Sequence, residues 1–150
     1  MSKPTPLLVL GLGNVLLQDD GVGSTAVSGL LERYEVPAGV LVLDGGTLGL
    51  SLLPHVEDAE NLILVDAVRT DAPPGAIVRL DGRDVLPAVA TRLSPHQVGV
   101  LDLLDGARWR DRFPSYVALV GIVPDGFELS MTLTPPVAAA VPALVEAIVD

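Results

Sequence analysis

Residues Leu7–Gly23 read LLVLGLGNVLLQDDGVG, and this stretch decides how the rest of the chain is arranged. Its first part, Leu7–Leu12, is a continuous apolar run, which predicts a parallel strand buried on both faces. The glycines that follow favour a turn. Two adjacent carboxylates, Asp19 and Asp20, then precede apolar residues at helical spacing, which predict a helix from about Gly21 to Tyr34.

Strand-like and helix-like segments alternate through the remaining sequence. We predict further strands at Val40–Asp44, Asn61–Ala67, Ala76–Leu80 and Tyr116–Val123. We predict further helices at Leu50–Val56, at Ser94–Arg108, where Val98, Leu101 and Leu104 should be buried, and from Thr134 onward. This alternation predicts an α/β fold: a single three-layer domain over residues 1–150, with a twisted, mostly parallel sheet of about five strands and helices on both faces.

Three details of this arrangement can be tested separately. Arg79 interrupts an apolar run, so Ala76–Leu80 is expected at the edge of the sheet. Asp81–Leu93 has no clear periodicity and is expected to be a loop. Pro142 should kink or interrupt the last helix, because proline lacks the N–H that an interior helical position donates.

The composition excludes several classes of function. The chain has no cysteine, which excludes disulfides, thiolate catalysis and cysteine-based zinc sites. Its formal net charge of −10 makes nucleic acid and anionic membranes unfavourable partners. No window approaches the roughly 20 apolar residues of a membrane span. With an N-terminus that lacks a signal-peptide pattern, these features predict a cytoplasmic protein.

Three aspartates are expected at one edge of the sheet. Asp44 and Asp66 each end a predicted strand, and Asp20 lies in the loop after another. If the first strand lies between the second and third, the loops that carry these carboxylates converge at the carboxyl ends of the strands, where open α/β sheets bind ligands. Neighbouring carboxylates raise one another's pKa unless a cation lies between them, so we expect a metal ion there.

His96 is the candidate imidazole ligand for such a metal ion. It lies in the first turn of the helix expected after Ser94, where the helix dipole disfavours the imidazolium form. Two carboxylates and one imidazole leave open positions on a divalent ion, as in a catalytic rather than a structural site. His55, by contrast, is read as an ordinary surface or core residue.

Simpler interpretations of the same residues remain open. In these interpretations Asp19 or Asp20 serves only as the N-cap of the first helix, and Asp44 only forms a turn. A dinucleotide site is not supported, because the GxGxxG pattern would need a glycine where the chain has Leu16. Carboxylates would also lie where a pyrophosphate needs a bare helix N-terminus.

Four sequence blocks in order resemble the hydrogenase maturation proteases: GLGNVLLQDDGVG, DGGTLG, LVDAV and SPHQVG. The resemblance covers nearly the whole chain and includes the later segments VGIVPD and LTPPV. Members of this family are endopeptidases that remove a C-terminal peptide from the large-subunit precursor of nickel-iron hydrogenases after the metal centre is loaded. The resemblance therefore implies a hydrogenase precursor as partner and a protease that requires no more than a monomer.

The resemblance also implies roles for individual residues. The family's metal-site positions correspond to Asp20, Asp66 and His96 in this sequence. Asp44, which the resemblance adds to the catalytic set, lies with Gly45, Gly46 and Thr47 in a block implicated in substrate recognition or cleavage. The implied metal is nickel carried by the precursor as a recognition signal, with water as the attacking group and no organic cofactor.

Two other functions are compatible with the same ligands. A maturation chaperone could bind nickel or the precursor without cutting it. A self-contained metal hydrolase could act on a small amide, and it would bind its metal tightly by itself. Formation of a single product fragment from the precursor would separate the protease from both.

Overall fold

A five-stranded sheet forms the centre of the computed structural model, which describes residues 4–46, 49–68, 70–82, 104 and 106–149. The strands are β1 (Thr5–Leu12), β2 (Val40–Gly46), β3 (Ala59–Ala67), β4 (Ile77–Asp81) and β5 (Tyr116–Ile122). Their spatial order is β2-β1-β3-β5-β4, so the first strand lies between the second and the third, as predicted.

All neighbouring strands are parallel except β4, which runs antiparallel to β5 at the edge of the sheet. The predicted edge position of the segment around Arg79 is therefore confirmed. The registers of β1 with its two neighbours place Gly11 beside Asp44 on one side and Val65 on the other. The carboxyl ends of β1, β2 and β3 consequently meet at one edge.

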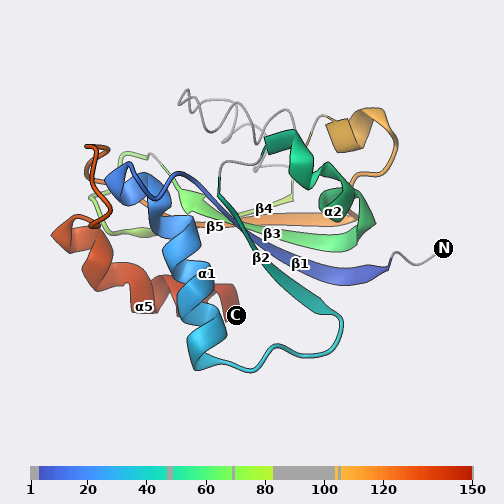
Figure 1. The fold of residues 1–150 in the computed structure, drawn as a ribbon, viewed down its shortest axis with the longest axis horizontal. Helices are drawn as coiled ribbons and strands as arrows, with labels where there is room; N and C mark the ends of the chain where they lie inside the picture. Colours follow the sequence, from blue (N-terminus) through green and yellow to red (C-terminus); the bar gives the residue numbers. More distant parts are fainter. Residues whose placement is uncertain (1–3, 47–48, 69, 83–103, 105, 150) are drawn as a thin grey trace.

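Helices cover both faces of the sheet (Figure 1). The helices α1 (Val22–Arg33) and α5 (Pro135–Val149) lie on one face, and α2 (Leu53–Asp58) lies on the other. Two short 3₁₀ helices, η1 (Gln18–Gly21) and η2 (Gly49–Leu52), precede α1 and α2. The predicted single α/β domain with three layers is confirmed.

Side chains alternate between the two faces along the buried strands, which explains their continuous apolar sequences. In β1, Leu8, Leu10 and Leu12 pack in the cluster on the α2 face, and Val9 packs in the cluster on the α1 and α5 face. Each face thus has its own aliphatic core, and the sheet between them is buried on both sides.

Of the two effects predicted for Pro142, an interruption of the last helix does not occur, and a kink stays a prediction. α5 continues through this residue from Pro135 to Val149. Pro142 lies on the exposed side of the helix. Water can therefore hydrate the carbonyl group that has lost its N–H partner, which reduces the cost of an interior proline.

The helix predicted from Ser94 is described only at its end. Leu104 and Ala107 are buried in the core on the α2 face, and residues 106–109 are helical. The predicted start at Ser94, the buried positions Val98 and Leu101, and nearly all of the expected loop over residues 81–93 lie outside the described residues. In the part of the chain that the structure describes, no helix has the length and apolarity to cross a bilayer.

Asp19 joins two distant parts of the chain at the carboxyl edge of the sheet. Its side chain is fully buried. One carboxylate oxygen accepts hydrogen bonds from the N–H groups of Asp125 at 2.8 Å and Gly126 at 2.9 Å, and from the Thr134 hydroxyl at 2.6 Å. The other oxygen accepts from the N–H of Thr134 at 2.9 Å.

Asp19 is therefore not the N-cap of α1, and that interpretation is wrong. The N-cap residue is Gly21, which has no side chain to form a cap. Burial acts to raise the pKa of the Asp19 carboxyl, but the hydrogen bonds from Thr134, Asp125 and Gly126 outweigh it and hold the pKa below its usual value. The carboxylate form is thus the one that stabilises the fold.

We predict that Asp19→Asn lowers the free energy of unfolding at pH 7 by about 2–3 kcal/mol, because charge-assisted hydrogen bonds to buried groups are lost. The folded-state pKa of Asp19 is depressed, so its contribution is present above the unfolded pKa and is lost as pH falls through the folded value. The stability difference between wild type and variant should therefore shrink below about pH 3.8. Urea unfolding between pH 7 and pH 3 measures it.

Asp71→Asn is the matched control, because Asp71 is exposed in the turn between β3 and β4. This variant should unfold within about 0.5 kcal/mol of wild type, as exposed substitutions usually do. A stability difference for Asp19→Asn that stays constant through acid pH would contradict the assigned role.

Candidate functional site

The candidate site lies where β1, β2 and β3 end. Asp20 is in η1, the 3₁₀ turn between β1 and α1, and η1 packs directly against β3. Asp66 is the penultimate residue of β3. The parallel register and the packing of η1 bring these two acidic residues to the same edge, as the strand order predicts.

Asp20 is held in a buried position by the turn after β1. It is 2% exposed, and its Oδ2 atom accepts a hydrogen bond from the N–H of Asn14 at 2.8 Å. Gly13 makes this turn possible: its φ is +112°, and a Cβ atom there would lie 1.8 Å from the Asp20 carbonyl oxygen. Glycine is required because the backbone at residue 20 folds directly over this position.

Asp66 provides the second buried carboxylate of the edge. It is 6% exposed, and its Oδ1 atom accepts a hydrogen bond from the N–H of Ala67 at 2.8 Å. Two buried carboxyl groups, those of Asp20 and Asp66, therefore lie on adjoining elements at this edge.

Asp44 has a different environment. It ends the apolar run of β2 and is exposed. Its Oδ1 atom accepts hydrogen bonds from the Ser24 hydroxyl at 2.6 Å and from the N–H of Gly46 at 3.2 Å. Among the described residues, the donors to Asp44 all reach its Oδ1 atom, so this oxygen orients the carboxylate.

The expected cluster of three aspartates around one cation does not form. In the described ranges, no three acidic or histidine side chains are grouped so that they could bind one metal ion. The reason is local: Ser24, which is buried in the first turn of α1, binds Asp44 and turns its carboxylate toward the helix. His96 lies outside the described residues, so the set of Asp20, Asp66 and His96 stays a prediction.

The two glycines after Asp44 have different surroundings. A Cβ atom at Gly45 would meet the side chains of Leu52 and Leu10 at 2.7 and 2.9 Å, so a packing requirement accounts for this glycine. Gly46 has a φ of +52° and open space where a Cβ would project. Of the two, Gly46 is the one whose backbone an approaching ligand can reach. Thr47 lies outside the described residues.

The donors present at the edge suit a divalent cation. Carboxylate oxygens and imidazole nitrogens are ligands that first-row transition metals accept, and the described residues supply two buried carboxylates. The hydrogen bonds from Asn14 and Ala67 orient these carboxylates, as groups around metal ligands commonly do. The described part of the edge thus supplies donor types that a divalent cation accepts.

Sequence reasoning missed three contributors to the site. It did not predict the hydrogen bond from Ser24 to Asp44, the N–H of Asn14 on Asp20, or the connection of Asp19 to Thr134. The first two carry no signal in a single sequence. The third involves the segments VGIVPD and LTPPV, which are part of the resemblance to the hydrogenase maturation proteases. Asp125 in the first segment and Thr134 in the second donate hydrogen bonds to Asp19.

The fold and the edge together define an α/β domain with an acidic site at the carboxyl ends of its parallel strands. A family model described as hydrogenase maturation protease matches residues 25–150. The chain is 39% identical to the hydrogenase 2 maturation protease of Escherichia coli K12 over 140 residues, which is 92% of this chain and 85% of that protein. The chain belongs to the hydrogenase maturation protease family.

Other relatives agree with this assignment. The chain is 44% identical to the hydrogenase expression/formation protein HupD of Rhodobacter capsulatus over 124 residues, covering 81% of this chain and 59% of that protein. The solved structure of the hydrogenase maturating endopeptidase HybD from E. coli matches with a TM-score of 0.90 at 36% identity, over 96% of this chain and 90% of that one. HybD from Thermococcus kodakarensis matches with a TM-score of 0.78 at 30% identity, over 96% and 97%.

We predict that Gly13→Ala destabilises the protein by about 3 kcal/mol or more, because the new Cβ would collide with the backbone at Asp20. Gly82→Ala is the matched control. Gly82 also has a positive φ, +54°, but open space around it, so this variant should lose only about 1 kcal/mol. Thermal and urea unfolding measure both, and equal losses would show that Gly13 is needed only for its dihedral angle.

Proposed function

We propose that this protein is the endopeptidase that removes the C-terminal extension from the large-subunit precursor of a nickel-iron hydrogenase after nickel insertion. The observation that carries the proposal is the pair of buried carboxylates, Asp20 and Asp66, at the carboxyl edge of the fold. Membership of the hydrogenase maturation protease family supports a peptidase activity and a hydrogenase precursor as substrate.

In this proposal nickel belongs to the substrate and acts as the recognition signal. Asp20, Asp66 and His96 contact the nickel that the precursor already holds. Burial of the two carboxylates strengthens their attraction to a cation, because the local dielectric is lower than that of water. A precursor without nickel would not offer this attraction, and this difference is the basis of selectivity.

Peptide hydrolysis needs an attacking group and a polarised carbonyl. We assign water as the attacking group and Asp44 as its general base, since Asp44 is exposed and its Oδ2 atom accepts no hydrogen bond from a described residue. The nickel of the precursor would polarise the scissile carbonyl as a Lewis acid. Gly46, with open space at its Cα, lets the peptide backbone approach beside Asp44.

The direct test is cleavage of a verified cognate precursor with and without nickel, followed by mass spectrometry of the products. We expect one C-terminal fragment, released only from the nickel-loaded precursor. Cleavage regardless of nickel would overturn the role of nickel as a signal. Binding of the loaded precursor without any cleavage would instead identify a maturation chaperone. A cytoplasmic location and a monomeric state stay predictions from the sequence.

We predict that Asp20→Asn and Asp66→Asn each lower kcat/KM for the loaded precursor by about 100-fold or more, because each removes a charge that faces the metal. His96→Ala should have a similar effect. Asp125→Asn is the control: Asp125 is exposed and contributes its backbone N–H, not its carboxylate, to the edge. Wild-type rates for Asp66→Asn and His96→Ala would refute the assignment.

We predict that Ser24→Ala lowers kcat by about 10- to 100-fold with little change in KM, because a misoriented reactive group slows the chemical step. The variant loses the hydroxyl that holds Asp44 at 2.6 Å. Ser24→Thr restores a hydroxyl at the same position and should recover part of the rate. Steady-state kinetics of precursor cleavage measure kcat and KM for each variant. An unchanged kcat for Ser24→Ala would contradict the assignment of Asp44 as the general base.

A further inference from the structure

β2 has the sequence of a central strand but lies at the edge of the sheet. Its first four residues, VLVL, are apolar on both faces, and all four are only partly buried. In the part of the chain that the structure describes, β2 pairs with β1 alone. Charges, prolines or bulges normally protect edge strands against pairing with another chain, and Val40–Leu43 has none of these features.

The hydrogen-bond pattern shows which backbone groups of β2 point outward. Gly39 accepts a hydrogen bond from the N–H of Leu7 in β1. Backbone groups alternate in direction along a strand, so residues 39, 41 and 43 face β1. The backbone groups of Val42 and Asp44, and the carbonyl of Val40, therefore lie along the outer edge.

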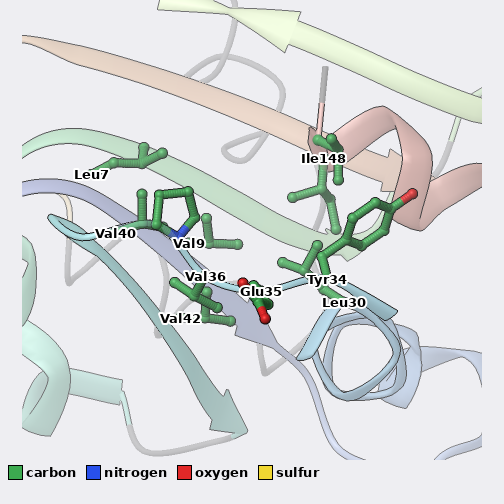
Figure 2. A pocket seen from close by; sticks show the side chains of 11 residues that line it. Leu7, Val9, Leu30, Tyr34, Glu35, Val36, Val40, Val42 and Ile148 are labelled. Atoms are coloured by element: carbon green, nitrogen blue, oxygen red, sulfur yellow. The ribbon is translucent and has the colours of Figure 1, made fainter. Parts of the chain in front are cut away.

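An apolar pocket lies beside this edge on the face of α1 and α5. Its volume is about 230 Å³, and Val40 and Val42 of β2 form one side of it. Leu30 of α1, Tyr34 directly after α1 and Ile148 of α5 form the other side, as Figure 2 shows. The loop residues Glu35, Val36 and Pro37 also line the pocket.

The edge and the pocket together match the requirements for binding an extended peptide. Such a peptide adds a strand through main-chain hydrogen bonds and places alternate side chains in neighbouring pockets. A strand paired with Val42 would direct every second side chain to the face that carries Val40 and Val42. Followed toward its carboxyl end, the same edge reaches Asp44 and Gly46, so a peptide bound there leads directly into the candidate site.

We propose that the outer edge of β2 docks an extended segment of the hydrogenase precursor next to the scissile bond, with an apolar side chain in the pocket beside Val40 and Val42. This inference rests on the proposed function for the identity of the peptide. A second copy of the chain is a poorer occupant, because each copy carries a net charge of −10 and the two would repel. Continuity with Asp44 and Gly46 favours the substrate.

Two variants test the edge and the pocket separately. Val42→Pro removes an N–H that points outward, so it blocks an added strand without removing a bond to β1. Val36→Asp places a charge at the pocket on a residue that is 38% exposed and lies in a loop. Leu31→Asp is the matched control, because Leu31 is 50% exposed on α1 and does not line the pocket.

The measurement is steady-state cleavage of the nickel-loaded large-subunit precursor, with circular dichroism to verify folding. We expect Val42→Pro and Val36→Asp to raise KM about 10-fold with kcat retained, and Leu31→Asp to match wild type. A wild-type KM for folded Val36→Asp and Val42→Pro would overturn the proposal. If Val42→Pro fails to fold, the KM of Val36→Asp by itself tests the proposal.

Binding measured by calorimetry separates this proposal from the proposed function. If wild-type protein does not cleave the precursor, the function fails, but docking still stands if the precursor binds wild type and binds Val36→Asp at least 10-fold more weakly. Equal binding would overturn docking. Sedimentation tests the other occupant: a wild-type dimer that Val36→Asp dissociates, with precursor binding unchanged, would assign the edge to a second copy.

Discussion

The buried carboxylate of Asp19 is the constraint on which the carboxyl edge of the sheet depends. Three backbone N–H groups and one hydroxyl converge on it, and they come from the loop after β5 and from the residue before α5. Neither segment is close to Asp19 in the sequence. A buried charge with four donors is stable only in one geometry, so this interaction fixes the positions of η1, of the loop after β5 and of the start of α5 relative to one another.

This constraint explains how two adjacent aspartates come to have different roles. Consecutive side chains on a 3₁₀ turn are about 120° apart, so Asp19 and Asp20 in η1 point in different directions. Asp19 faces the loop after β5, and Asp20 is held by the N–H of Asn14 at the edge near β3. The residue before them, Gln18, adopts a φ of +49°. A strained backbone angle of this kind persists where surrounding interactions hold it in place. Here the hydrogen bonds of the neighbouring Asp19 contribute to holding it.

The start of β2 exposes apolar residues at the sheet edge, and its end carries Asp44, the proposed general base. At its start, apolar residues remain partly exposed along an edge that no described strand covers. At its end, Ser24 orients the Asp44 carboxylate from the first turn of the helix that follows Asp20. A peptide paired with this strand would be aligned by backbone groups before it reaches Asp44. In the proposed function, main-chain geometry would supply binding and orientation and would tolerate differences in substrate sequence, while the acidic residues would supply selectivity for a cation.

Four features could be predicted from the amino-acid order alone: the α/β class, the position of β1 between β2 and β3, the edge position of β4, and the presence of acidic residues at one edge. These follow from apolar runs and connection rules, which are local or nearly local. Three other features became clear from the folded structure: Asp19 stabilises the fold rather than capping α1, Ser24 binds Asp44, and Pro142 remains within α5. The physical reason is that each of these outcomes depends on a partner or on water exposure set by distant packing. A single sequence carries no record of which donor will face which carboxylate.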